Sequence, residues 1–217
     1  MIHTLIISGG NIEVDLALKV LKEHYDHIIG VDGGLKFCYE QQILPTRIVG
    51  DFDTLSPEIL EWYRSHTKIE IREYNPVKDA TDTQIAVELA VELGSGRITI
   101  LGGTGTRLDH VLGNMHTLYL PFSRGIDCQI LDAHNRIRLI QGEFHIRKEE
   151  QYGTYFSLIP FTTEVKEVTL RGAKYPLERY PFTVLGTGSL GVSNEIQDEQ
   201  VDILVEGGIM LLVESKD

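Results

Sequence analysis

Strand-like and helix-like segments alternate along the first two-thirds of this 217-residue chain. Short apolar runs with the length and composition of strands are Thr4–Ser8, His27–Val31, Arg47–Val49, Ile69–Arg72, Arg97–Leu101 and Cys128–Leu131. The segments between them carry apolar residues at helical spacing and are Val14–Glu23, Leu35–Gln42, Pro57–Ser65, Asp82–Leu93 and Leu108–Leu120. Because strands that alternate with helices form βαβ units, this region is predicted to be a doubly wound, mostly parallel α/β sheet.

The alternation of strand-like and helix-like segments ends at about Asp132. Only short strand-like runs follow, without helical spacing between them: Ile137–Ile140, Tyr152–Ile159, Val165–Leu170, Thr183–Leu185, Gly191–Ile196, Val201–Val205 and Ile209–Val213. Glu206-Gly207-Gly208 predicts a tight hairpin turn between the last two runs. We therefore predict two domains, an α/β domain over residues 1–133 and an all-β sandwich or open barrel over residues 134–217.

Composition narrows the class of function. A formal net charge of −12 argues against a nucleic-acid-binding protein, which normally presents a basic face. Cys38 and Cys128 are the only cysteines, too few for a disulfide scaffold or a thiolate zinc site. The N-terminus lacks the features of a signal peptide, and no apolar stretch has the length of a membrane span. We expect a soluble, cytoplasmic protein that binds neither nucleic acid nor membrane.

Three polar clusters between Gly50 and His110 carry the chemistry. They are Gly50-Asp51-Phe52-Asp53-Thr54, Lys78-Asp79-Ala80-Thr81-Asp82-Thr83-Gln84 and Leu101-Gly102-Gly103-Thr104-Gly105-Thr106-Arg107-Leu108-Asp109-His110. Each follows a predicted strand directly or closely, and loops at the carboxyl ends of strands line the ligand crevice of an open α/β sheet. Carboxylates, glycines and an arginine gathered there can hold a metal ion and a phosphate chain. The clusters therefore indicate phosphoryl chemistry.

Asp51 and Asp53 flank Phe52, so on an extended chain their side chains point to the same side. Two carboxylates that close repel each other unless a cation lies between them, and Mg²⁺ prefers such oxygen ligands. A solvated turn is the competing interpretation. Phosphatases of the haloacid dehalogenase type and nucleotide-sugar glycosyltransferases also use an Asp-x-Asp pair, but neither class explains the other two clusters.

Thr81 and Asp82 begin a predicted helix, where Thr81 can cap the first turn and Asp82 can complement the helix dipole. Capping alone would explain both residues. Lys78 and Asp79 just ahead favour a site instead, because a lysine suits a phosphate and Asp82 suits a shared metal ion.

The glycines of the third cluster let backbone amides approach an anion, and Arg107 can grip phosphate oxygens with two donors. This is not a Walker A loop, because no Gly-Lys-Ser/Thr follows. Leu108 stands where a dinucleotide fingerprint needs its third glycine. Ser8-Gly9-Gly10-Asn11, at the end of the first strand, is left open as a contact of the nucleotide.

Taken together and in order, these motifs resemble those of the thiamine pyrophosphokinase family, bacterial type. The matching residues are Asp32-Gly33-Gly34, Gly50-Asp51-Phe52-Asp53, Lys78-Asp79-x-Thr81-Asp82-Thr83-Gln84, Gly102-Gly103-x-Gly105-x-Arg107-x-Asp109-His110 and Ser193-Asn194-Glu195. The resemblance implies an α/β nucleotide- and Mg-binding catalytic domain followed by a β-sandwich that binds thiamine. It also implies transfer of pyrophosphate from Mg-ATP to the hydroxyethyl oxygen of thiamine, with AMP as the second product.

The resemblance further implies residue roles. Mg²⁺ would be held by Asp51, Asp53 and Asp82, which together with Arg107 form the catalytic set. The nucleotide-binding residues would be Asp32, Gly33, Lys78, Asp79, Gly102, Gly103, Gly105, Arg107, Asp109 and His110. Ser193 and Asn194 would contact thiamine, at a site between the α/β domain of one subunit and the β domain of its partner. A homodimer is therefore expected.

Two other classes remain open on the sequence. A Mg-dependent phosphatase or nucleotidyltransferase acting on another small substrate would use the same carboxylates, but its turnover of ATP would not depend on thiamine. A non-catalytic thiamine- or nucleotide-binding module could keep the fold, although binding alone does not require a full set of metal ligands.

Overall fold

The structure is a computed structural model that describes residues 1–75 and 80–217. Lys78 and Asp79, two predicted nucleotide-binding residues, lie outside the described residues. The chain divides into two compact units, Met1–Ala133 and His134–Asp217. In the described part of the chain, no helix is long and apolar enough to cross a membrane.

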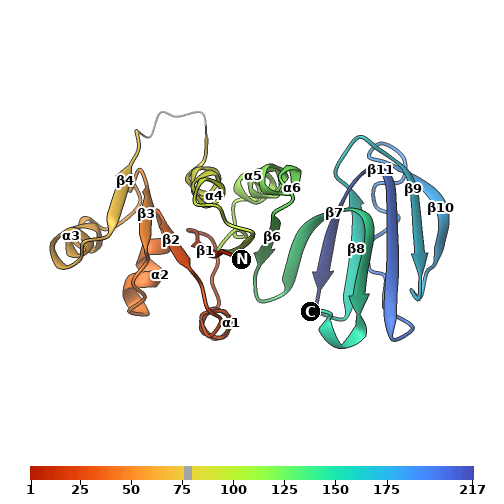
Figure 1. The fold of residues 1–217 in the computed structure, drawn as a ribbon, viewed down its shortest axis with the longest axis horizontal. Helices are drawn as coiled ribbons and strands as arrows, with labels where there is room; N and C mark the ends of the chain where they lie inside the picture. Colours follow the sequence, from red (N-terminus) through yellow and green to blue (C-terminus); the bar gives the residue numbers. More distant parts are fainter. Residues whose placement is uncertain (76–79) are drawn as a thin grey trace. The chain divides into compact units, whose positions relative to one another are not determined.

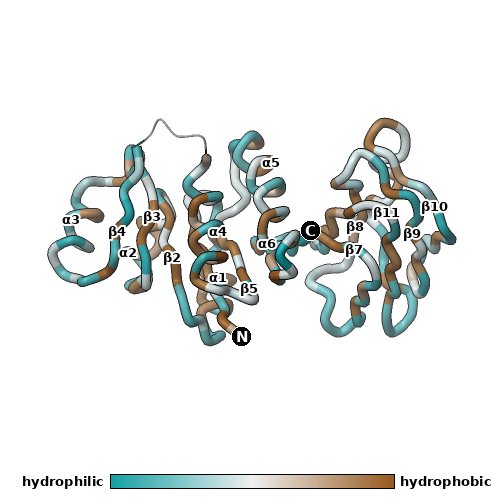
Figure 2. Tube along the Cα trace, turned by 45° about the horizontal axis from the view of Figure 1, so that its top comes forward, coloured by the Kyte–Doolittle hydropathy of each residue, from teal (hydrophilic) through white to brown (hydrophobic). Residues whose placement is uncertain are grey.

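The first unit contains a parallel sheet with the strand order β6-β5-β1-β2-β3-β4 (Figure 1). The strands are β1 (His3–Ile7), β2 (His27–Val31), β3 (Arg47–Gly50), β4 (Glu70–Glu73), β5 (Arg97–Leu101) and β6 (Asp127–Leu131). Ile7 of β1 is in register with Gly30 of β2 on one side and with Leu101 of β5 on the other. Hydrophobic stretches of this unit follow its strands (Figure 2), and Leu5, Ile6 and Ile7 are fully buried. The predicted doubly wound sheet is confirmed.

The helices of this unit lie on both faces of the sheet. They are α1 (Val14–Val20), α2 (Gly34–Glu40), α3 (Pro57–His66), α4 (Asp82–Glu92), α5 (Leu108–Thr117) and α6 (Tyr119–Ser123). The chain passes from β1 to β4 through α1, α2 and α3 on one face and then builds β5 and β6 with α4, α5 and α6 on the other (Figure 1). The direction of winding therefore reverses between β1 and β5, and ligands of such sheets bind at the carboxyl ends beside that reversal.

Local sequence explains where these helices begin. Thr81 caps α4 as predicted, because its hydroxyl accepts a hydrogen bond from the Gln84 amide at 3.2 Å. In α3, Pro57 occupies the first turn, but the side chain of Ser56 makes no capping hydrogen bond. The proline therefore sets that start without a capping hydrogen bond from the serine hydroxyl.

The second unit is antiparallel and consists of β7 (Asn135–Arg147), a single 3₁₀ turn η1 (Lys148–Glu150), β8 (Tyr155–Pro160), β9 (Glu164–Arg171), β10 (Leu177–Thr183) and β11 (Gln200–Ser215). One edge of β11 pairs with β7 along its length. Its other edge pairs first with β9, over Asp202–Glu206, and then with β8, over Met210–Ser215. This exchange of partners folds the strands over one core that includes Phe156, Phe182 and Leu212, as the predicted β-sandwich requires.

The predicted hairpin at Glu206-Gly207-Gly208 is wrong. The chain continues as one strand, with a register shift between Val205 and Met210 and a φ of +67° at Gly207. Glycine at positive φ permits a bulge as readily as a turn, so the local sequence did not distinguish the two.

Two further strand predictions in this unit are wrong. Gly191–Ile196 forms no strand, and only Asn194 and Ile196 make isolated bridges, to Phe156 and Ala173. Thr183–Leu185 lies where β10 ends, and Leu185 is 95% exposed. The β10 strand itself was missed because Glu178 and Arg179 interrupt its apolar pattern.

Candidate functional site

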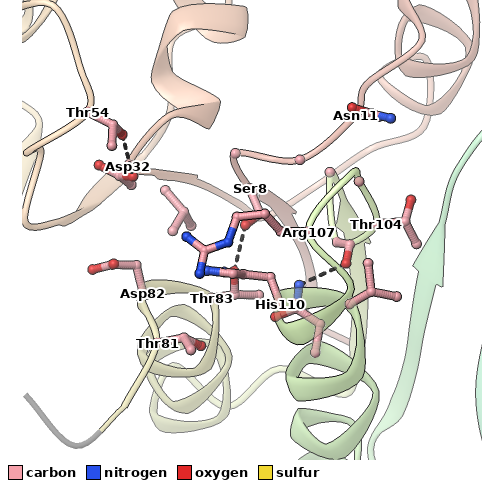
Figure 3. A pocket seen from close by; sticks show the side chains of 18 of the residues that line it. Ser8, Asn11, Asp32, Thr54, Thr81, Asp82, Thr83, Thr104, Arg107 and His110 are labelled. Atoms are coloured by element: carbon pink, nitrogen blue, oxygen red, sulfur yellow. Dashed lines mark hydrogen bonds between the residues drawn. The ribbon is translucent and has the colours of Figure 1, made fainter.

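A cavity of about 590 Å³ lies at the carboxyl ends of the strands in the first unit. Its walls come from loops that follow β1, β2, β3 and β5 and from the first turns of α4 and α5 (Figure 3). Predicted site residues among its lining are Asp32, Asp51, Asp82, Gly102, Gly103, Gly105, Arg107 and His110. The three polar clusters are thus brought to one place, as far as the described residues show.

One wall of the site is acidic. Carboxylate oxygens of Asp32, Asp51 and Asp53 all lie within 4.8 Å of one another. Among the described residues this group contains Asp32, which was predicted as a nucleotide contact, in place of Asp82. Asp82 lines the same cavity from the start of α4 (Figure 3).

The backbone around this acidic group is unusual. Asp32 has a φ of 40° and Phe52 a φ of 59°, values that non-glycine residues seldom adopt. A Cβ at Gly50 would lie 3.1 Å from the Asp32 Cα, so the ends of β2 and β3 approach closely because Gly50 has no side chain. Strained backbone of this kind persists where the surrounding structure holds functional groups in a fixed arrangement.

Asp32 is half-buried and incompletely satisfied. Its Oδ2 accepts a hydrogen bond from Thr54 Oγ1 at 3.1 Å, whereas its buried Oδ1 has no hydrogen-bond partner in the described part of the chain. Burial raises the pKa of Asp32, and the negative charges of Asp82 and Asp51 raise it further. A buried carboxylate oxygen facing other carboxylates suits a hard divalent cation, which would offset both the desolvation and the repulsion. The donor set therefore fits Mg²⁺.

The opposite wall is built from glycine backbone. A Cβ on Gly10 would lie 2.1 Å from the Thr104 carbonyl oxygen, and one on Gly102 would lie 2.2 Å from the Ser8 carbonyl oxygen. Gly102 also has a φ of +67°. Side chains at these positions would therefore push apart the loops that follow β1 and β5.

Arg107 and its neighbours lie at the rim. The Arg107 side chain extends over the cavity (Figure 3) and is exposed, and it forms an ion pair with Asp109, also exposed, with 2.7 Å between Nη2 and Oδ2. The hydrogen bond from Arg107, followed by one from the His110 amide, lowers the pKa of Asp109 to about 2. An exposed guanidinium at the mouth of the cavity can exchange this carboxylate for phosphate oxygens.

Sequence analysis missed Asn114 of the cavity and gave no individual role to Ser8 or Thr83. Ser8 Oγ and Thr83 Oγ1 are buried and lie 2.6 Å apart, which ties the end of β1 to α4. Asn114 on α5 is also buried, and its Nδ2 donates to the Gly103 carbonyl at 2.8 Å. The Ser8-Gly9-Gly10-Asn11 segment, left open above, lines the cavity.

The predicted thiamine contacts belong to the second unit. Asn194 is 5% exposed, and its side-chain amide is engaged by the surrounding backbone. Its Oδ1 accepts from the amides of Tyr175 and Glu195, while Nδ2 donates to the Tyr175 carbonyl. Ser193 is exposed with a φ of 59°, and its amide donates to Ser157 Oγ. Asn194 therefore shapes the loop, whereas Ser193 is presented at its surface.

Comparison with known proteins covers both units. The family model for the thiamin pyrophosphokinase catalytic domain matches residues 18–130, and the model for the thiamin pyrophosphokinase vitamin B1 binding domain matches residues 141–210. The thiamine pyrophosphokinase of Bacillus subtilis (strain 168) is 32% identical over 218 residues, which cover 98% of this chain and 98% of that protein.

Solved structures agree along the full length. A crystal structure of thiamine pyrophosphokinase from Bacillus subtilis matches with a TM-score of 0.87 at 31% identity, over 99% of each chain. One of thiamin pyrophosphokinase from Geobacillus thermodenitrificans matches with a TM-score of 0.84 at 29% identity, over 100% of this chain and 98% of that one. The fold is thus shared with these proteins from one end of the chain to the other.

Proposed function

This chain belongs to the thiamine pyrophosphokinase family, and we propose that it binds Mg-ATP in the cavity of its first unit for the transfer of pyrophosphate to thiamine. The chain is an enzyme with thiamine pyrophosphokinase activity, which gives thiamine pyrophosphate and AMP. The observation that supports the cavity as the site is the meeting of the carboxylates of Asp32 and Asp51 with a glycine-rich wall within one 590 Å³ space.

The acidic wall is proposed to hold Mg²⁺ through Asp32, Asp51 and Asp53. Asp82, predicted as a ligand from the family resemblance, stays part of this proposal because it lines the same cavity and its charge acts on Asp32. When bound, Mg²⁺ would neutralise phosphate charge as it is redistributed during transfer. Phe52 and Gly50 hold the ligands in place through the close approach of β2 and β3.

The remaining phosphate contacts are proposed for Arg107 and the glycine loop Gly102, Gly103 and Gly105. Arg107 supplies a mobile positive charge that Asp109 keeps near the rim. Gly33, Lys78, Asp79, Asp109 and His110 stay predicted nucleotide-binding residues. Transfer of this kind depends mainly on positioning and on charge stabilisation, both of which these groups supply.

Thiamine is proposed to bind through the second unit, where the vitamin B1 binding model matches. Ser193 is the proposed direct contact, because its side chain is exposed, and Asn194 is proposed to support the loop that carries it. We further propose that the active site forms between subunits of a homodimer, with the nucleotide on one subunit and thiamine on the partner's β unit. The cytoplasmic location stays a prediction from the sequence.

The test is the formation of AMP and thiamine pyrophosphate from ATP and Mg²⁺, measured with and without thiamine. Equal amounts of the two products, appearing only with thiamine, are expected. Release of ADP, or turnover that ignores thiamine, would instead favour the metal-dependent phosphatase or nucleotidyltransferase alternative. Gel filtration and light scattering test the dimer, and a monomer that is fully active would exclude a site shared between subunits.

A further inference from the structure

In the glycine loop between β5 and α5, the backbone carbonyl groups and the backbone amides differ in their hydrogen bonding. The carbonyl oxygens of four successive residues are each fixed by a donor: Leu101 by the Ser8 amide at 2.8 Å, Gly102 by the Gly10 amide at 2.9 Å, Gly103 by Asn114 Nδ2 at 2.8 Å and Thr104 by the Asn11 amide at 2.7 Å. In contrast, the amides of residues 103–106 donate to no acceptor within the described ranges. All four of these residues line the cavity.

Amides without acceptors beside carbonyls that already have donors favour the binding of an anion. Consecutive amides without partners are available as donors to an anion, and sets of such amides bind phosphate groups. A peptide unit places its C=O and N–H on opposite sides, so a partner that fixes the carbonyl also fixes the direction of the next amide. The donors to the carbonyls of Gly102, Gly103 and Thr104 therefore decide where the amides of residues 103–105 point.

Asn114 is the one side chain among these donors. The others are backbone amides of the segment Ser8–Asn11, which a substitution cannot remove. Asn114 is 6% exposed on α5, so its amide group is held by packing as well as by the hydrogen bond. Gly103 itself has no room for a side chain, because a Cβ there would lie 2.9 Å from Ile130 Cγ2.

We propose that Asn114 is a positioning residue for the triphosphate: by fixing the Gly103 carbonyl it turns the next amide of the glycine loop, that of Thr104, toward the phosphate oxygens. The proposal rests on the assignment of this cavity to ATP. Asn114 needs no contact with the reacting atoms for this role. Its effect should therefore appear in the affinity for phosphate and not in the affinity for thiamine.

The decisive variant is Asn114→Asp, which keeps the size of the side chain but replaces the donor Nδ2 by a carboxylate oxygen. Two oxygens would then face each other at Gly103, and the loop would turn away. Asn114→Ala removes the donor without adding a charge. The matched control is Thr117→Val, which removes another buried side-chain hydrogen bond on α5, from Thr117 Oγ1 to the Gly113 carbonyl, at a residue outside the cavity lining.

Binding of ATP, of AMP and of inorganic triphosphate, each with Mg²⁺, is measured by calorimetry on the full chain, together with KM for ATP and for thiamine. Both Asn114 variants are expected to weaken ATP and inorganic triphosphate alike, by about tenfold, the factor that one hydrogen bond supplies. AMP binding should weaken less, and KM for thiamine should stay within about twofold of the value for the unmodified chain. In the control Thr117→Val, KM for thiamine should likewise stay within about twofold of that value.

Other patterns would overturn the inference. Unchanged triphosphate binding with a lowered melting temperature would make Asn114 a purely structural residue. Weaker ATP binding with normal binding of inorganic triphosphate would mean that Asn114 acts on the nucleoside part of ATP and not on its phosphates. The proposed function fails separately, because an unmodified chain that makes no thiamine pyrophosphate could still lose triphosphate binding when Asn114 is replaced.

Discussion

The carboxylate of Asp109 accepts two hydrogen bonds from the guanidinium group of Arg107, at 3.3 Å from Nε and 2.7 Å from Nη2. Both residues flank Leu108 at the start of α5, so the pair is local and forms without help from the rest of the fold. Because both side chains are largely exposed, the pair contributes little to folding. Under the proposed function, the pair keeps the Arg107 guanidinium group in one place for the phosphates of ATP.

Arg107→Ala is accordingly expected to abolish turnover, while Asp109→Ala raises KM for ATP severalfold and leaves a measurable kcat. Neither change should move the melting temperature appreciably. The lowered pKa of Asp109, about 2, means that its carboxylate holds Arg107 at every pH above the acid range and releases it only as the pH falls through that value. Steady-state kinetics with a thermal melt of each variant check this, and an Asp109→Ala enzyme with unchanged KM would contradict it.

Replacement of a ligand in the acidic wall should separate metal binding from folding. Asp32→Asn removes a charge that is half-buried beside Asp51 and Asp53, so the melting temperature without Mg²⁺ is expected to rise. The additional stabilisation on adding Mg²⁺ should shrink or vanish.

Asp53→Ala is expected to lose turnover together with the Mg²⁺ effect. The control is Asp15→Asn on α1, which removes one exposed carboxylate far along the chain from the acidic wall. Thermal melts at fixed ionic strength, with and without Mg²⁺, measure these differences. If Mg²⁺ stabilised Asp32→Asn as much as the unmodified protein, Asp32 would not be a ligand.

A pair of glycines distinguishes backbone strain from crowding. Gly102 and Gly125 have nearly the same positive φ, +67° and +70°, but a Cβ at Gly102 would meet the Ser8 carbonyl at 2.2 Å whereas one at Gly125 meets nothing within 4 Å. Gly125→Ala should therefore lower the free energy of unfolding by only about 1 kcal/mol and keep full activity.

Gly102→Ala should in addition separate the loops after β1 and β5, and ATP binding should be lost. Denaturant unfolding and ATP titration of the two variants make the comparison. If Gly102→Ala and Gly125→Ala had the same free energy of unfolding and the same affinity for ATP, the close contact at Gly102 would not be needed for ATP binding.

The second unit contains a carboxylate whose pairing can be tested by pH. Glu214 is fully buried, its oxygens accept from Arg136 and Arg138, and Tyr152 donates its amide as well. Burial acts to raise the pKa of Glu214, but the hydrogen bonds and charges of the two arginines outweigh it and leave the pKa lowered. The contribution to stability is therefore complete above the ordinary pKa of glutamate and is lost as the pH falls through the lowered value.

Glu214→Gln is expected to lower the free energy of unfolding by about 3 kcal/mol near neutral pH, because two partly buried arginines lose their fully buried counter-charge. The difference from the unmodified chain should shrink in acid, where the original carboxylate is also neutral. Urea unfolding at a series of pH values measures it. A pH-independent difference would mean that packing and not charge is responsible.

Much of the first unit could be predicted from sequence because each step has a local cause. The strands are short apolar runs with the two faces of the sheet both covered, and Thr81 and Pro57 mark helix starts by chemistry that involves only neighbouring residues. The site clusters were found because the carboxyl ends of parallel strands meet at one edge. Asp51 and Asp82 could therefore be expected to meet although they are far apart in sequence.

The rest depends on contacts that the sequence does not display. Asp32 joins Asp51 and Asp53 because β2 and β3 are adjacent and Gly50 lets them approach, and nothing near Asp32 in the sequence signals this. Asn114 lies a full turn beyond the recognised motif and resembles any polar residue on a helix. In the β unit, the two edges of β11 have different partners, so the meaning of Gly207-Gly208 is decided by β8 and β9.

That exchange of partners along β11 has a consequence for how the protein is made. On the ribosome, β7, β8, β9 and β10 all emerge before Gln200, yet β7, β8 and β9 each need β11 as a neighbour. The β unit therefore cannot close its core until the segment to Ser215 has left the exit tunnel. The α/β unit, by contrast, has all its strands by Leu131 and can fold first, so a ribosome that stalls after this unit has emerged would display the α/β unit without the β unit.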